Sequence, residues 1–254
     1  MCRQVGLLFG RKPHNHWPDR FTNLLQACEA GGPDASGLAV IQRDGRHCIT
    51  KRPGPVSALL GAVDDNHALS QWDEDTVAVL GHTRRTTRGS VDNPLNNHPL
   101  RRGQVIATHN GTLFNADRLF EALGLPRLAE VDSELLVQIA NHCLDDEGLD
   151  LDLLRRAVAL CVGQLSAVLV ALTQPDTLVI LKGNKPLSFA VHPRSRTLLY
   201  ATDPQVLALG INQEHGWEPL AVPSMTIAIF HRDVPTRPVL KPFDFHARGR
   251  GAWL

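Results

Sequence analysis

The 254-residue sequence has no excess of charge, since 26 Lys and Arg residues balance 26 Asp and Glu residues. No global field therefore draws the protein toward nucleic acid or a membrane surface. No apolar run approaches the roughly 18 residues of a membrane span. The first residues also lack the basic segment and long apolar core of a signal peptide. These absences predict a cytoplasmic protein without nucleic-acid or membrane partners.

Cysteine is sparse and unpaired. The five cysteines are widely spaced and form no CxxC pair, which argues against a disulfide framework or a structural zinc site. Cys28, Cys143 and Cys161 lie in helix-like apolar patterns that predict small buried hydrophobes, and Cys48 lies in a predicted strand. Packing does not explain Cys2, which follows the initiator methionine.

The apolar content of 43% and the charged content of 20% are typical of a soluble globular protein. Strand patterns come first, helical patterns follow, and strands then return, which predicts a layered α+β domain. The predicted strands cover 4–10, 36–42, 46–51, 76–82, 103–109, 166–173, 177–183, 187–192, 196–202 and 225–230. The predicted helices cover 21–30, 115–124, 132–144, 151–162 and 203–210.

No internal repeat, linker or nucleotide-binding glycine motif divides the chain. We therefore predict a single domain over 1–254. The last residues are rich in proline and basic side chains. They predict either an extended C-terminal arm over 235–254 or a loose terminus.

Three polar segments follow or interrupt the predicted strands. Loops at strand ends are where binding groups gather in proteins. The segments are GHTRRTTRG at 81–89, NNHP at 96–99 and THNGTLFN at 108–115. Each has an ordinary structural interpretation when taken singly. Arg84 could be a surface cation, Asn110-Gly111 is a common turn, and Asp132 is a good helix N-cap.

The histidines in these segments also have an ordinary interpretation. His82 and His109 follow strands and could be core histidines, and His98 precedes a proline. A zinc site built from His82, His98 and His109 is weakly supported, because no two of them stand at the ligand spacing of a helix face.

Taken together and in order, these segments resemble the glutaminase domain of class II glutamine amidotransferases, the N-terminal nucleophile type. The matching pieces are Cys2, DASGLAV at 34–40, GHTRRTT at 81–87, NNHP at 96–99, HNGTLFN at 109–115 and VDSE at 131–134, with looser matches at GNKPL (183–187) and ATDPQVL (201–207). The resemblance implies a four-layer αββα sandwich of two mainly antiparallel sheets. It also implies that Cys2 begins a central strand.

The resemblance implies roles for particular residues. Cys2 is the expected nucleophile, and its α-amine, freed by removal of Met1, is the expected general base. The Asn110 side chain and the Gly111 N–H would form the oxyanion hole. Arg84 would bind the α-carboxylate of glutamine and Asp132 its α-ammonium, while Thr87 would complete the pocket. The expected reaction converts glutamine and water to glutamate and ammonia through a Cys2 thioester, with no metal or organic cofactor.

Two features depart from the family pattern. Arg85 stands where many members carry an aromatic residue near the route by which ammonia leaves, so the inherited gating mechanism does not transfer directly. The chain also ends soon after the glutaminase-like region, which predicts a separate synthase subunit that accepts the ammonia. Two alternatives remain open: an N-terminal nucleophile amidase for another amide, or a catalytically silent regulatory or binding domain.

Overall fold

The computed structural model describes residues 2–13, 16–61, 67–212 and 214–247. Met1 and the last residues of the predicted C-terminal arm lie outside these ranges. Within them, no helix is long and apolar enough to cross a membrane.

Seven antiparallel strands form the first sheet, in the order β15-β13-β14-β1-β4-β2-β3. They are β1 (Arg3–Phe9), β2 (Ala35–Gln42), β3 (His47–Pro53), β4 (Thr76–Arg84), β13 (Ser188–His192), β14 (Thr197–Ala201) and β15 (Glu218–Leu220). The first strand of the chain is thus the central one. Because both faces of this sheet are covered, β1 and β4 are almost wholly buried and appear as continuous apolar runs in the sequence.

Six antiparallel strands form the second sheet, in the order β17-β16-β12-β11-β6-β5. They are β5 (Leu100–Arg102), β6 (Val105–His109), β11 (Ser166–Ala171), β12 (Thr177–Lys182), β16 (Thr226–His231) and β17 (Val239–Pro242). Five short strands make two small sheets: β7 (Thr112–Leu113), β10 (Val162–Gln164) and β18 (His246–Ala247) in one, β8 (Leu144–Asp145) and β9 (Gly148–Leu149) in the other.

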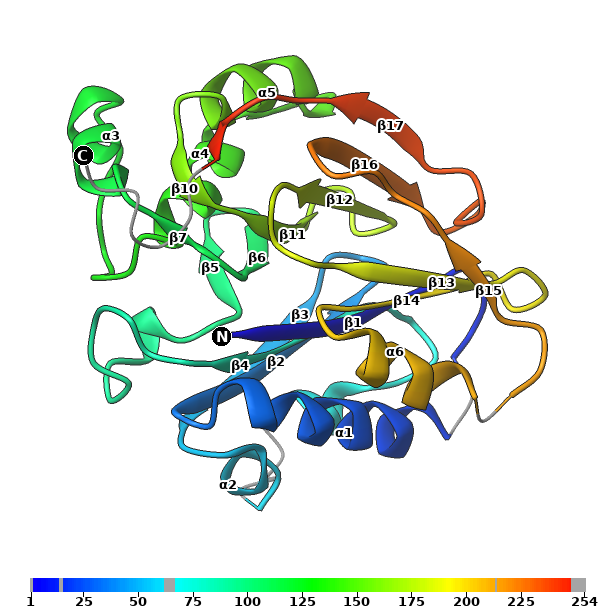
Figure 1. Ribbon diagram of the computed structural model, residues 1–254. Coiled ribbons are helices and arrows are strands. Elements are labelled where there is room, and N and C mark those ends of the chain that lie inside the picture. Colours follow the sequence, from blue (N-terminus) through cyan, green and yellow to red (C-terminus); the bar gives the residue numbers. More distant parts are fainter. Residues whose placement is uncertain (1, 14–15, 62–66, 213, 248–254) are drawn as a thin grey trace.

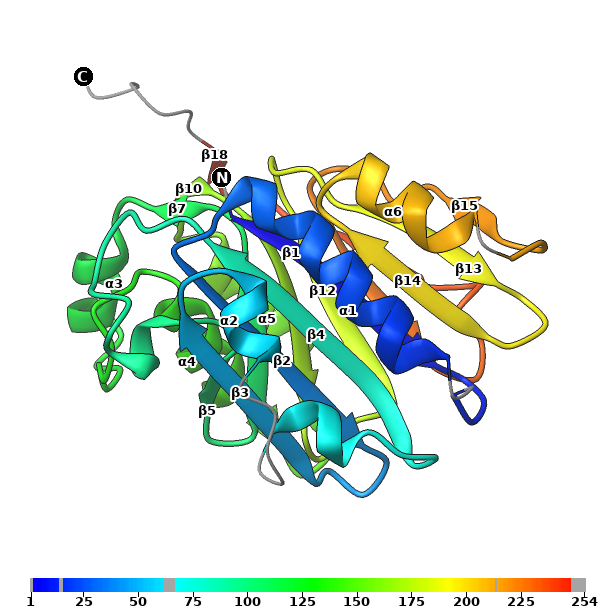
Figure 2. The same ribbon diagram turned by 90° about the horizontal axis from the view of Figure 1, so that it is seen from below.

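Helices cover the outer faces of the two large sheets (Figures 1 and 2). On the first sheet lie α1 (Trp17–Cys28), α2 (Val56–Leu60) and α6 (Pro204–Ile211). On the side of the second sheet lie α3 (Ala116–Ala122), α4 (Glu134–His142) and α5 (Leu151–Val158). Three short 3₁₀ helices complete the description: η1 (Glu29–Gly31), η2 (Ala68–Gln71) and η3 (Pro94–Asn96).

Three apolar clusters separate the four layers. Side chains of α1 and α6 pack on β1 in the first, and α4 and α5 pack on the second sheet in another. Between the sheets, Leu8, Tyr200 and Phe230 are fully buried with side chains from both. The predicted αββα sandwich of the N-terminal nucleophile hydrolase type is confirmed, and so is the position of Cys2 directly before the central strand.

Several local predictions are also confirmed. The Arg43–Gly45 turn joins β2 to β3 as an antiparallel hairpin. The predicted helix at 203–210 forms as α6, with Asp203 capping it by accepting a hydrogen bond from the Gln205 N–H. Cys28, Cys143 and Cys161 are buried, and burial raises the pKa of their thiols to about 12, 11 and 12, respectively.

The structure differs from the sequence prediction at more than one helix end. The helix predicted at 21–30 begins earlier, at Trp17, and ends at Cys28. The predicted helix at 151–162 ends at Val158, because Val162 and Gly163 pair with β7 and β18 instead. In the C-terminal region, β17 pairs with β16 and β18 pairs with β10. Residues 248–254 lie outside the described part of the chain.

Candidate functional site

The end of the central strand places the Cys2 thiol beside the end of β4. Arg3 pairs with Thr83 across β1 and β4, so Cys2 meets the residues that follow Thr83. The Arg85 N–H donates to Cys2 Sγ at 3.3 Å, and Sγ lies 3.5 Å from the Arg85 carbonyl oxygen. Burial raises the pKa of the thiol, and the Arg85 N–H and the Arg84 charge oppose that rise. A raised thiol pKa means that a base must take the proton before sulfur attacks.

Gln4 connects this strand to the second sheet. Its Nε2 donates to the Ser166 carbonyl oxygen at 2.9 Å, and its Oε1 accepts from Thr108 Oγ1 at 2.6 Å. Ser166 in turn exchanges two backbone hydrogen bonds with Asn110, at 2.8 and 3.0 Å. Cys2 at the end of one sheet is therefore held in register with the HNG segment of the other.

The HNG segment presents its polar groups at the end of β6. The Asn110 side chain is almost fully buried, and its Nδ2 has no hydrogen-bond partner within the described chain. Gly111 has φ +156°, and a Cβ there would lie 1.9 Å from the Gln164 carbonyl oxygen. Only glycine fits this contact. A buried amide donor without an acceptor beside a thiol is suited to stabilise a developing oxyanion.

Arg84 is buried immediately beside this cleft. Its Nη1 donates to Asn97 Oδ1 at 2.7 Å, and its Nη2 donates to the Arg88 carbonyl oxygen and, at 2.9 Å, to that of Gly89. Burial lowers the pKa of the Arg84 guanidinium, whereas the Cys2 and Asp132 groups raise it. The guanidinium thus organises its own loop and still exerts its charge on Cys2.

Asp132 lies on the other side, at the entry to α4. Its Oδ2 accepts a hydrogen bond from the Leu113 N–H at 2.6 Å, and the N-cap of α4 is Ser133. The Asp132 charge acts to raise the pKa of both Cys2 and His109, so the carboxylate lies within electrostatic range of the Cys2 thiol. It is 7% exposed and holds the β7 backbone in place.

A small cleft of about 280 Å³ joins these elements. It is lined by Cys2, Arg85, Thr87, Asn110, Gly111, Thr112, Gln164 and Lys185. Four predicted site residues, Cys2, Thr87, Asn110 and Gly111, therefore line one cleft. The other two, Arg84 and Asp132, are buried next to it. The sequence reasoning missed Thr112, Gln164 and Lys185, and only the loose GNKPL match signalled the last of these.

Three buried histidines lie behind the cleft. The rings of His82 and His98 stack with centroids 4.2 Å apart, and His82 Nε2 lies 3.1 Å from the His109 carbonyl oxygen. Burial lowers the pKa of all three, to about 3 for His82. No group of three or more His, Cys, Asp or Glu side chains is arranged to hold a metal ion in the described ranges.

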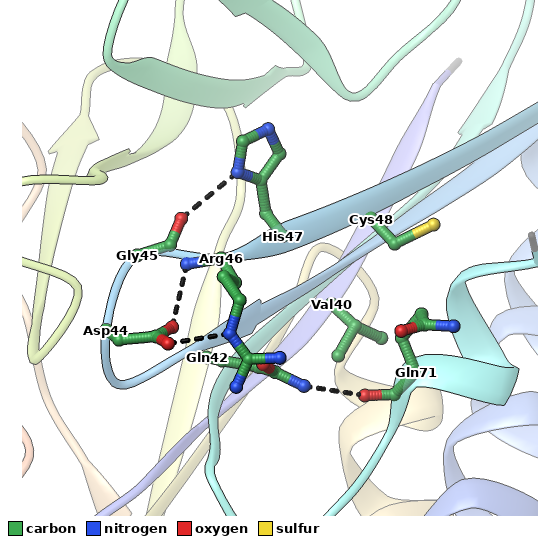
Figure 3. A pocket seen from close by; sticks show the side chains of 8 residues that line it. All are labelled: Val40, Gln42, Asp44, Gly45, Arg46, His47, Cys48 and Gln71. Atoms are coloured by element: carbon green, nitrogen blue, oxygen red, sulfur yellow. Dashed lines mark hydrogen bonds and ion pairs between the residues drawn. The ribbon is translucent and has the colours of Figure 1, made fainter.

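A larger hollow lies elsewhere, at the β2–β3 hairpin. It has about 870 Å³ of open space and is lined by Val40, Gln42, Asp44, Gly45, Arg46, His47, Cys48 and Gln71. Figure 3 shows that Arg46 turns to Asp44, at 2.6 Å, and that the Gln42 amide turns to the Gln71 carbonyl oxygen, at 3.1 Å. The donors of Arg46 and Gln42 are thus bonded within the hairpin region, so this groove lacks the unpartnered donor found beside Cys2.

Known proteins are similar in sequence to a large part of this chain. The chain is 32% identical over 167 residues to the glutamine–fructose-6-phosphate aminotransferase of Pseudomonas putida, covering 64% of this chain and 26% of that protein. It is 29% identical over 196 residues to the corresponding protein of Neisseria meningitidis, covering 75% of this chain and 30% of that protein. The matched region thus spans about a quarter to a third of the curated relatives. No protein-family model matches the chain.

Solved structures share the fold. The glutamine phosphoribosylpyrophosphate amidotransferase of B. subtilis, in complex with ADP and GMP, aligns with a TM-score of 0.72 at 18% identity. The alignment covers 96% of this chain and 49% of that one. The sequence and fold similarities together confirm the resemblance to class II glutamine amidotransferases of the N-terminal nucleophile type.

Proposed function

We propose that this chain is a glutaminase that hydrolyses L-glutamine to L-glutamate and ammonia. The observation that carries the proposal is the convergence of the Cys2 thiol, the unpartnered Asn110 Nδ2 and Gly111 in one cleft. The thiol comes from the residue before β1, whereas the buried donor and the glycine come from the HNG segment, and acyl transfer uses both a nucleophile and oxyanion donors. The similarity to glutamine-dependent enzymes supports glutamine as the amide.

The proposed reaction starts with transfer of the thiol proton to the α-amine of Cys2, exposed by removal of Met1. Sulfur attacks the side-chain amide carbon, and the Asn110 Nδ2–H and Gly111 N–H stabilise the oxyanion. The amine returns the proton to the leaving nitrogen, which departs as ammonia and leaves a thioester. Water then attacks the thioester, so that glutamate is released and the thiol is regenerated.

Arg84 and Asp132 are proposed to recognise the amino-acid end of glutamine. A guanidinium suits the α-carboxylate and a carboxylate suits the α-ammonium. Thr87 lines the same cleft as Cys2 and is proposed to complete the pocket. Both charges lie within electrostatic range of Cys2, which supports a zwitterionic amide as the substrate.

The organisation of the whole protein is also a proposal. We propose that residues 1–254 form a single class II glutamine amidotransferase domain, in which residues 235–254 are an extended C-terminal arm. We also propose that the protein is cytoplasmic. A separate synthase subunit would consume the ammonia, because released ammonia is otherwise lost.

A substrate comparison tests the assignment. We expect glutamine to be hydrolysed with a kcat/KM about 10- to 100-fold above that of N-acetylglutamine, because blocking the α-amine removes a charged hydrogen bond. Asp132→Asn should reduce this preference, and Arg84→Lys should raise KM for both amides. An enzyme that turns over both amides equally would point to a different amide substrate. Absence of ammonia release from protein lacking Met1 would favour a silent binding domain.

A further inference from the structure

The imidazole of His109 connects the HNG segment to two neighbouring elements. His109 directly precedes Asn110, and it is 3% exposed. Its Nε2 lies 3.2 Å from the carbonyl oxygen of Gln164, a residue of β10 that lines the Cys2 cleft. Its Nδ1 lies 2.8 Å from Oγ of Ser133, the N-cap residue of α4. One buried ring thus contacts both the wall of the cleft and the entry to α4.

These contacts fix the tautomer of the ring. A carbonyl oxygen can only accept a hydrogen bond, so Nε2 carries the proton and donates to Gln164. Burial lowers the pKa of His109, which keeps the ring neutral near pH 7. The neutral ring has an acceptor at Nδ1, which accepts from the Ser133 hydroxyl. His109 is therefore held as the Nε2–H tautomer.

The Gln164 carbonyl oxygen lies against the residues assigned to the oxyanion. A Cβ on Gly111 would stand 1.9 Å from this oxygen and 2.6 Å from His109 Nε2. Gln164 is also paired with Thr112 in the ladder between β10 and β7. A carbonyl oxygen can accept two hydrogen bonds, so loss of the His109 donor would open it to another donor. Asn110 Nδ2 has no partner within the described chain, and Asn110 and Gly111 line the same cleft.

We propose that His109 is a positioning residue for glutamine hydrolysis, because its Nε2–H holds the Gln164 carbonyl oxygen and keeps this acceptor from capturing the Asn110 and Gly111 donors. Without it, the donors would bond to the protein and would have to be released before they met the oxyanion. This step rests on the proposed function. It assigns His109 an effect on the oxyanion donors and none on the thiol.

Two substitutions separate the ring nitrogens. The side-chain nitrogen of glutamine reaches close to the place of Nε2, whereas that of asparagine reaches close to the place of Nδ1. We expect His109→Asn to lower kcat about 10- to 100-fold with KM changed less than about threefold, because small displacements at a reacting centre have effects of this size. His109→Gln keeps a donor for Gln164 and should restore kcat to within about threefold of the unmodified protein.

His67 offers a matched control. It is 1% exposed, its Nδ1 accepts from the Leu69 N–H at 3.1 Å, and its Nε2 lies 3.2 Å from the Leu59 carbonyl oxygen. The bonding pattern is that of His109, but the ring lies between α2 and η2, away from the cleft residues. We expect His67→Asn to lower the free energy of unfolding as His109→Asn does, and to leave kcat and KM unchanged.

Alkylation of Cys2 shows whether the thiol is affected. The proteins carry Cys48→Ser, so that the other partly exposed thiol does not react, and peptide mass spectrometry follows Cys2. Iodoacetamide reacts by displacement of iodide, a step that places no charge on an amide oxygen. The alkylation rate should therefore stay within about twofold in His109→Asn while glutamine turnover falls.

The outcomes separate this role from the proposed function. An unchanged kcat in His109→Asn, or equal losses in the Asn and Gln variants, overturns the role of His109 while the unmodified protein remains a glutaminase. A fall in the alkylation rate parallel to kcat also overturns it. So does an Nδ1–H tautomer of His109 in ¹⁵N NMR spectra, since Nε2 would then have no proton to donate. Absence of ammonia release from the unmodified protein lacking Met1 contradicts the proposed function, and the role of His109 with it.

Discussion

Two hollows of this molecule each contain a partly exposed cysteine, an arginine and an amide side chain with an unpartnered atom. At the hairpin, these are Cys48, Arg46 and Gln42, and the unpartnered atom is the acceptor Gln42 Oε1. At the end of β1 they are Cys2, Arg85 and Asn110, and the unpartnered atom is the donor Asn110 Nδ2. Only a donor can stabilise an oxyanion, so the smaller hollow has the chemistry that the larger one lacks.

The comparison teaches that the volume of a hollow does not locate the candidate site. The hairpin groove is about three times as large, at about 870 Å³ against 280 Å³. Its residues come mainly from one hairpin, close together in sequence. The Cys2 cleft instead collects groups from segments that the sequence separates widely and both sheets hold in place.

Replacing each of the two cysteines should give the largest difference in glutamine turnover. Cys2→Ala should reduce glutamine turnover on the order of 10⁴-fold or more, because no other group supplies the nucleophile. Cys48→Ala should leave turnover near that of the unmodified protein. Release of ammonia and glutamate measures both variants, and circular dichroism checks that each is folded. Equal activity of the two alanine variants would reject the assigned nucleophile.

Replacing each of the two amide side chains should give the next largest difference, in kcat. Asn110→Ala deletes the unpartnered donor but keeps the backbone pair with Ser166, and it should lower kcat about 10²- to 10³-fold. Gln42→Leu deletes the acceptor at the hairpin and should not change kcat. Steady-state kinetics at saturating glutamine distinguishes them. A rise in KM alone for Asn110→Ala would mean that Asn110 binds glutamine without stabilising the transition state.

Glycine substitutions test how tightly the cleft is built. Gly111→Ala should lower the free energy of unfolding by about 3 kcal/mol, because its Cβ would meet the Gln164 carbonyl oxygen at 1.9 Å. Gly124→Ala is the control: it also has positive φ, at +60°, but its Cβ would contact no atom within 4 Å. Denaturant titrations of both variants measure the difference. Equal losses would mean that the backbone strain, and not the contact, decides the cost.

The histidines behind the cleft predict a smaller, pH-dependent effect. Their pKa values are depressed in the folded protein, so the unfolded chain binds protons first as the pH falls. Stability is therefore full above about pH 6.5 and declines below it, by about 1.4 kcal/mol per pH unit for each histidine. Denaturant titrations between pH 7.5 and 5 should show a shallower slope for His98→Asn.

Much of this site could be predicted from short motifs. Cys2, the Asn110-Gly111 pair and Thr87 occur in recognisable segments, and the cleft brings them together. The order of strands, then helices, then strands again also indicated a layered α+β domain, and the family resemblance implied the four layers. Gln164 could not be found in this way, because its position depends on the pairing of β10 with β7 and β18, which are far away in the sequence. Periodicity describes which face of an element is buried, but it does not describe which loops meet.

The partners of Arg84 show the same limit. The sequence suggested an arginine available to a substrate, whereas the structure shows bonds to Asn97, Arg88 and Gly89 in the loop that follows. Those contacts depend on the backbone path of the loop after Arg84, which the amino-acid composition does not predict. Short strands such as β5, β7 and β10 were missed because two or three residues give no readable pattern.

The Gln4 side chain bonds to Ser166 and Thr108 across the interior of the sandwich, two residues from Cys2. Sulfur and oxyanion donors thus belong to different halves of the molecule, and neither half contains a working centre. We therefore expect glutaminase activity to appear only when the two sheets have docked, as the last event of folding. We expect it to disappear when the layers first separate.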